Sequence, residues 1–79
     1  MSESYYLVQQ ISIDDNNQSI CSEPIPFNTM ETIIEYSLPI FNSQKTYMTH
    51  TENTNEYILK SSDNENIIFF ILEINKYLV

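Results

Sequence analysis

The chain has 79 residues, with eleven acidic residues against three lysines, no arginine and no glycine, and a formal net charge of −8 at pH 7. A surface so poor in cations cannot neutralise phosphates, which excludes nucleic-acid binding, and a chain without glycine cannot form the glycine-rich loops that cradle nucleotide phosphates. A single cysteine, Cys21, and a single histidine, His50, exclude an internal disulfide and a Cys/His zinc site.

The first predicted element covers residues 4–13. Tyr5, Val8 and Ile11 lie at helical spacing, whereas Leu7, Ile11 and the other alternate residues lie at strand spacing. Periodicity therefore does not decide between the two structures. We predict a helix.

A polar turn and an edge strand follow. The Asp and Asn side chains of residues 14–17 can bond to their own backbone and tolerate left-handed conformations, which predicts a turn. Residues 18–23 have strand composition and run into Pro24 and Pro26, which lack the N–H that a sheet requires. We therefore predict a strand at the edge of the sheet.

The clearest helix signal comes next. Asn28 or Thr29 can cap the helix, and we expect it to end near Ser37, before Leu38 and Pro39. Its apolar residues fall at positions i, i+3 and i+4: Met30, Ile33 and Ile34.

The second half of the chain predicts strands separated by Asn- and Asp-rich turns. These segments are residues 45–51, 56–61 and 67–73, with residues 76–79 as a last short strand. Together the elements predict one small α+β domain over residues 1–79, with an antiparallel sheet of about four to five strands and two helices.

No segment predicts export or membrane insertion. The first 20 residues lack a basic start, and the longest apolar run, residues 67–72, is far shorter than the ~20 residues that a membrane span needs. A hydrophobic content of 42%, with six Tyr and four Phe, is too high for a disordered acidic tail. We therefore expect a folded protein in a reducing cytoplasm.

Catalytic chemistry is not expected. His50 is the only candidate general base, and no Ser or Cys lies in the sequence context of an activated nucleophile. His50 lies at the end of a predicted strand beside Thr51, where we expect a hydrogen-bonded turn residue. We expect no catalytic residue, no cofactor and no metal ion.

The predicted helix has two contrasting sides. Glu31 and Glu35 form a mildly unfavourable i, i+4 pair of like charges, which is either a solvated helix face or a surface for a cationic partner. The other side, with Met30, Ile33 and Ile34, is either core or the lining of an adaptable pocket.

Four motifs, taken in order, resemble a known family. They are Gln18-Ser19-Ile20, Met30-Glu31-Thr32-Ile33-Ile34, Thr49-His50-Thr51 and Tyr57-Ile58-Leu59-Lys60-Ser61-Ser62-Asp63. Across roughly residues 17–63, this order is similar to the uracil-DNA glycosylase inhibitors of phages whose DNA contains uracil, which have Gln-Glu-Ser-Ile, Val-Glu-Glu-Val-Ile, Val-His-Thr and Val-Met-Leu-Leu-Thr-Ser-Asp. Gln18 stands where the family has a glutamate, unless Glu23 takes that place, and Thr32 stands where it has a second acid.

The resemblance implies a phage protein that inhibits the host uracil-DNA glycosylase by imitating DNA. It would be a monomer when free and bind the enzyme one to one, without contacting nucleic acid or membrane. Its edge strand would enter the positively charged groove of the enzyme, with Glu31 and Glu35 adding negative potential. The residues of that edge strand are Gln18, Ser19, Ile20 and Glu23.

The resemblance also implies an apolar pocket between helix and sheet, which holds the leucine that the enzyme inserts into DNA during base flipping. The matching positions are Met30, Ile33, Ile34, Met48 and Ile58. Mimicry further predicts that the three lysines lie away from the binding face. These are Lys45, Lys60 and Lys76.

Two other functions fit the acidic composition. A DNA mimic directed at a host restriction or CRISPR nuclease would need a continuous ridge of carboxylates and no pocket for a single side chain. An acidic structural or assembly protein could associate with itself through the apolar residues 67–72.

Overall fold

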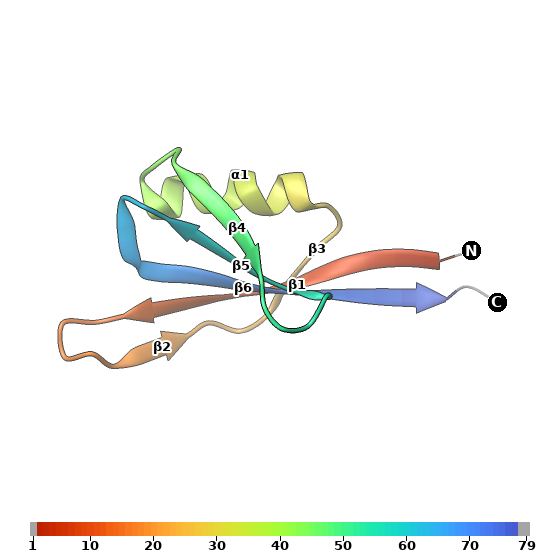
Figure 1. Ribbon diagram of the computed structural model, residues 1–79, viewed down its shortest axis with the longest axis horizontal. Coiled ribbons are helices and arrows are strands. Elements are labelled where there is room, and N and C mark those ends of the chain that lie inside the picture. The colour runs from red at the N-terminus through yellow and green to blue at the C-terminus, as the bar shows by residue number, and fades with distance from the viewer. Residues whose placement is uncertain (1, 78–79) are drawn as a thin grey trace.

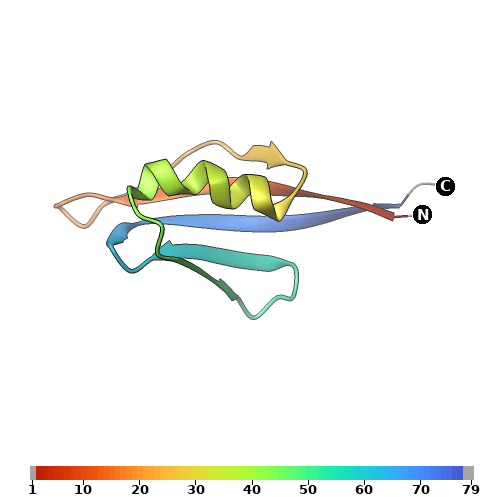
Figure 2. The same ribbon diagram turned by 90° about the horizontal axis from the view of Figure 1, so that it is seen from above.

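The computed structural model describes residues 2–77, which form a six-stranded antiparallel sheet with one helix lying across it (Figures 1 and 2). The strand order is β2-β1-β6-β5-β4, and β3 also pairs with β1. The predicted α+β class is confirmed, with six strands where about four to five were expected and one helix where two were expected. The elements are β1 (Ser2–Ile13), β2 (Ser19–Cys21), β3 (Ile25–Phe27), α1 (Met30–Phe41), β4 (Thr46–His50), β5 (Glu56–Ser61) and β6 (Asn64–Tyr77).

Strand β1 is the element that sequence periodicity misassigned. The predicted helix at residues 4–13 is wrong, because β1 pairs with β6 along its whole length, from Ser2 opposite Tyr77 to Ser12 opposite Ile67. Only the strand conformation places Val8 opposite Ile71 in the core, where each is at most 1% exposed. A partner more than sixty residues away in the chain therefore decides the structure of this segment.

The predicted edge strand at residues 18–23 is confirmed, although only β2 within it is regular strand. After β2 the chain leaves β1 and returns to it as β3, so that both short strands lie along the same edge. Ser22 fixes the segment between β2 and β3 to β1. Its N–H donates to the Gln10 carbonyl and its Oγ accepts the Gln10 N–H, both at 2.9 Å. Pro26 is tolerated within β3 because an edge strand leaves alternate nitrogens facing solvent.

Helix α1 begins as predicted and ends later than predicted. Thr29 is the N-cap, and its side chain accepts a hydrogen bond from the Thr32 N–H. The helix runs past Ser37 and through Pro39 to Phe41, so the predicted end is wrong. Its last turn is held by Phe41, whose buried ring meets Phe69 edge-on with centroids 5.1 Å apart. Burying an aromatic ring is worth roughly 1.5–3 kcal/mol, which offsets the backbone hydrogen bond that the proline removes.

The remaining strands match the sequence prediction closely, with one exception. Strand β5 has the predicted bounds and β4 is one residue shorter at each end than predicted. Residues 67–73 and 76–77 belong to one long strand, β6, so the separate last strand is wrong, and residues 78–79 lie outside the described residues.

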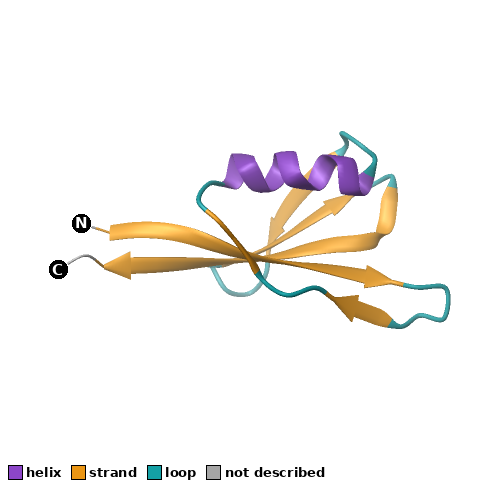
Figure 3. Ribbon diagram, turned by 180° about the vertical axis from the view of Figure 1, so that it is seen from behind, coloured by secondary structure: helices purple, strands orange, loops and turns teal. Residues whose placement is uncertain are grey.

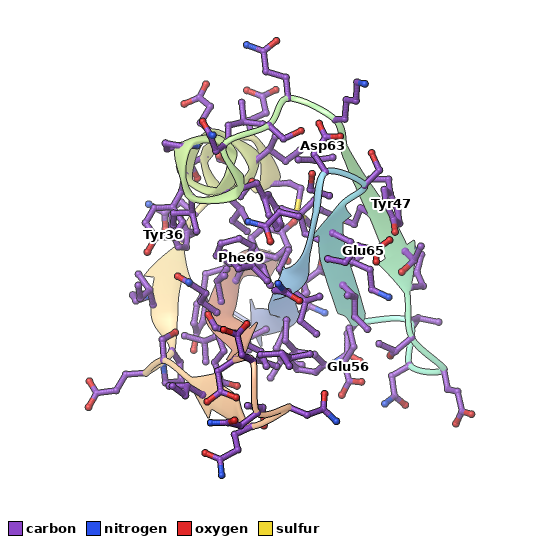
Figure 4. All side chains as sticks on the ribbon, turned by 90° about the vertical axis from the view of Figure 1, so that its left-hand side faces the viewer. Tyr36, Tyr47, Glu56, Asp63, Glu65 and Phe69 are labelled. Carbon is purple, nitrogen blue, oxygen red and sulfur yellow. The ribbon has the colours of Figure 1, made fainter. Side chains whose placement is uncertain are left out.

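The register divides the side chains of the sheet between two faces. The helix face carries the buried core, in which α1 packs against alternate residues of β1, β5 and β6 (Figure 4). Those core residues are Val8, Ile33, Phe41, Leu59, Phe69 and Ile71, each at most 2% exposed. The opposite face, here called the open face, carries the residues that alternate with the helix-facing residues along the same strands. Over residues 2–77, no helix has the length and apolar character needed to cross a membrane.

Candidate functional site

The edge hairpin, defined as residues 13–26, is the most exposed segment of the described chain. Every residue in it is exposed, and it projects from one end of the molecule, away from the paired chain termini (Figure 1). It carries three carboxylates, Asp14, Asp15 and Glu23, and no lysine. The structure thus presents an anionic projection with no cation of its own to neutralise it.

The turn of the edge hairpin is held by Asp14. Its Oδ1 accepts the N–H groups of Asn16 at 2.9 Å and Gln18 at 2.8 Å, and its own N–H donates to the Gln18 carbonyl at 2.9 Å. Asn17 adopts the left-handed conformation with φ 62°. The turn predicted from residues 14–17 is therefore confirmed, and its side-chain bonds fix where the neighbouring carboxylates lie.

Strand β2 brings the expected edge-strand residues together. Ser19 lies opposite Ile13 and Ile20 lies opposite Ser12, and the Ile20 side chain is 65% exposed. Gln18 precedes the strand and Glu23 follows it, both exposed. Because β2 is an edge strand, one row of its backbone N–H and C=O groups is free to pair with another molecule.

The acidic pair on α1 lies on a different side of the molecule from the edge hairpin. Glu31 and Glu35 are both exposed. Tyr36 marks the side of the helix that faces β3, because its ring lies 5.2 Å from that of Phe27 (Figure 4). At about 100° per residue, Glu35 lies about 100° and Glu31 about 140° around the helix from Tyr36. Glu31 and Glu35 therefore point away from β3. The carboxylates of the helix and those of the edge hairpin form two separate groups.

The five residues expected to line the apolar pocket do not lie on one side of the sheet. Ile33 is fully buried within the core, and Met30 and Met48 are partly buried against that core. Ile34 is half-buried on the helix, whereas Ile58 pairs with Phe70 on the open face. Ile58 therefore does not join the other four, because adjacent residues of a strand point to opposite faces.

A surface cavity of about 350 Å³ lies elsewhere, where the end of β1 approaches the turn between β5 and β6. The register shifts between β5 and β6 at residues 59–61, which opens the sheet at this point. No pattern in the sequence pointed to this cavity, because it depends on that shift. It is lined by Ile13, Tyr47, Lys60, Ser61, Glu65, Ile67 and Ile68.

The described lysines lie outside the edge hairpin. Lys45 is exposed just before β4, and Lys60 lines the cavity to which Ile13 of the edge hairpin also contributes. The Lys76 side chain lies outside the part of the structure that is described. That the lysines lie away from the binding face stays a prediction.

His50 is the last residue of β4, as expected, and its contact is with a ring. Its imidazole lies 4.5 Å from the Tyr57 ring, and this ring contact takes the place of the side-chain hydrogen bond that we expected. Within residues 2–77, no three His, Cys, Asp or Glu side chains gather closely enough to hold a metal ion. Cys21 is a free, exposed thiol in β2.

Comparison with known proteins gives no further assignment, since no family model, no curated protein and no solved structure matches this chain.

Proposed function

We propose that the chain is a protein inhibitor of a uracil-DNA glycosylase, which it binds one to one by imitating DNA. The observation that carries the proposal is the edge hairpin, an exposed projection with three carboxylates and no lysine. A DNA-binding groove is lined with cationic groups that bind phosphates, and carboxylates at matching positions can bind the same groups. The glycosylase is the enzyme implied by the motifs at residues 17–63.

Charge is expected to govern how fast the two proteins meet. With a formal net charge of −8, the inhibitor is attracted to a basic groove from a distance, and such steering raises the association rate by tenfold or more at low salt. The Asp14 side chain fixes the turn, so the hairpin should lose less conformational entropy on binding than a mobile loop would.

An apolar contact is expected to govern how long the complex lasts. Met30 and Met48 pack against the same core from α1 and β4, and Ile34, one helical turn after Met30, is half-buried. Met side chains rearrange readily, so these three residues could admit an aliphatic side chain of the enzyme. Ile33 would remain part of the core.

The test is an excision assay with a bacterial uracil-DNA glycosylase and a uracil-bearing oligonucleotide. We expect excision to stop when the inhibitor reaches the concentration of the enzyme, with one complex of equal stoichiometry on a sizing column. Undiminished excision in large molar excess of the inhibitor would refute the proposal.

Two variants of equal charge identify the binding surface. The hairpin variant combines Asp15→Asn with Glu23→Gln. The helix variant combines Glu31→Gln with Glu35→Gln, and each variant loses two negative charges. We expect the hairpin variant to associate about tenfold more slowly at low salt and the helix variant to change much less. Equal losses would mean that net charge acts without a defined site.

A nuclease antagonist is the second candidate, and one observation favours it. Ile33 is buried in the core and does not line a pocket for a single side chain, which a nuclease antagonist does not need. The separation of the helix and edge-hairpin carboxylates counts against this candidate, because it interrupts the continuous ridge that such an antagonist would present. Uninhibited glycosylase together with protection of DNA from a restriction or CRISPR nuclease would support this candidate.

A further inference from the structure

The open face of the sheet is apolar and uncovered. The run at residues 67–72 is apolar at every position, yet α1 covers only the side to which Phe69 and Ile71 point. Figures 1 and 3 show the only described helix on one side of the sheet and no element lying across the other. The open face carries these apolar side chains: Leu7, Ile11, Ile58, Ile68, Phe70 and Leu72.

Charge is distributed unevenly between this face and the rest of the molecule. Between residues 5 and 74, the strand positions that point to the open face include Glu56 and Lys60, and Glu65 lines the cavity beside Lys60. The formal charges of these three residues sum to −1, whereas the whole chain carries −8. Two copies of this face can therefore approach each other while most acidic groups of the chain stay outside the contact.

The face is large enough for a stable contact between two copies. β1 and β6 pair from Ser2 opposite Tyr77 to Ser12 opposite Ile67. With about 3.4 Å per residue and about 4.8 Å between strands, that pair and the adjoining β5 and β4 span roughly 600 Å². Two copies would bury about 1,200 Å², which lies at the lower end of the range for specific protein interfaces.

We propose that a second copy of this chain covers the open face, so that two sheets pack face to face in a two-fold dimer. Each partner contributes the same surface, and side chains such as Phe70 and Leu72 interdigitate as in a β-sandwich. This assembly replaces the monomer expected from the sequence. It can be tested separately from the proposed inhibition, because β2 of the edge hairpin lies at the border of the sheet, beside the strands β1, β6, β5 and β4 that carry most of the open face.

The dimer has a distinctive salt dependence. Two chains of charge −8 repel each other, and salt screens that repulsion while it leaves apolar burial in place. The dimer should therefore tighten as salt is added. Binding of the acidic edge hairpin to a basic enzyme should weaken under the same change.

The test is sedimentation of the full chain at protein concentrations up to about 200 µM, in about 20 and about 300 mM NaCl. We expect a species of twice 9.3 kDa at high concentration, with a lower dissociation constant in the higher salt. A chain that remains at 9.3 kDa under all these conditions would overturn the proposal and leave the face for a different protein.

A matched pair of exposed residues locates the contact. Tyr47→Lys places charge on the open face, at a side chain that is already 50% exposed, so the fold should tolerate the change. Ile20→Lys is the control, because Ile20 is 65% exposed on the other side of the edge strand. We expect Tyr47→Lys to raise the dissociation constant at least tenfold and the control to leave it unchanged. Equal weakening by both would assign the contact to β2 and contradict the proposal.

Discussion

Tyr6 and Glu73 lie opposite each other on the helix face, where β1 pairs with β6. The Tyr6 hydroxyl donates a hydrogen bond to the Glu73 carboxylate. Burial raises the pKa of Tyr6 above 10.0, and the charge and hydrogen bond of Glu73 raise it further. The fold therefore favours the neutral phenol, so the stability that this group contributes is complete below the ordinary tyrosine pKa and is lost as pH rises through the raised one.

Tyr6→Phe should reduce this loss of stability in alkali. The variant lacks the hydrogen bond to Glu73, so it should be less stable at neutral pH, by about 1 kcal/mol. Because it also lacks the titrating group, its free energy of unfolding should fall less steeply than that of the wild type above about pH 10. Urea unfolding across this range measures both effects.

The control for this variant is Tyr47→Phe, which removes a hydroxyl from a half-exposed ring on the open face. It should cost less stability at neutral pH than Tyr6→Phe does. If Tyr6→Phe and the wild type lose stability in parallel, the contact between Tyr6 and Glu73 does not have the role assigned to it.

At the scale of elements, helix α1 carries an unfavourable arrangement of charge. Glu31 lies in its first turn, no basic residue lies in its last turn, and Glu35 repels Glu31 one turn away. The negative end of the helix dipole lies at its C-terminus, so Glu35 is also closer to the unfavourable end. This arrangement makes α1 a place where one substitution should stabilise the protein.

Glu35→Lys should stabilise the fold by about 0.5–1 kcal/mol, because a Glu–Lys pair at i, i+4 replaces a pair of like charges. Thermal or urea unfolding measures the gain. Glu23→Lys makes the same change of charge outside the helix and should stabilise less. Equal stabilisation by both would show that net charge, and not the helix, determines the effect.

Some of these elements could be predicted from the sequence and others could not. β5, β2 and the start of α1 could be predicted because their signals are local: turn residues around a β-branched segment, prolines beside an edge and a Thr cap. β1 could not, because the residues that decide it lie on β6. The end of α1 depends on Phe69 in the same way.

In the candidate site, too, features with local signals could be predicted and features that depend on strand pairing could not. The edge hairpin could be predicted from its acids and prolines, which act locally. The pocket could not, because the face to which Ile58 points depends on how β5 pairs with β6, and a shift of one residue reverses it. The cavity beside Lys60 likewise depends on the irregular register at residues 59–61.

At the scale of the whole molecule, the fold separates two surfaces of opposite character. The molecule measures 48 × 24 × 22 Å, with the edge hairpin at one end of the long axis and the paired ends of β1 and β6 at the other (Figure 1). The edge hairpin is anionic, whereas the open face is largely apolar. One surface suits a cationic partner and the other suits a second copy.

The most direct test of DNA mimicry is competition for the glycosylase. The enzyme is immobilised, the inhibitor is bound, and duplex DNA is added at several salt concentrations. We predict that the inhibitor and the DNA exclude each other, and that the affinity of the inhibitor falls as salt rises. A ternary complex in which the enzyme holds both at once, or an enzyme that does not bind the inhibitor at low salt, would contradict the account.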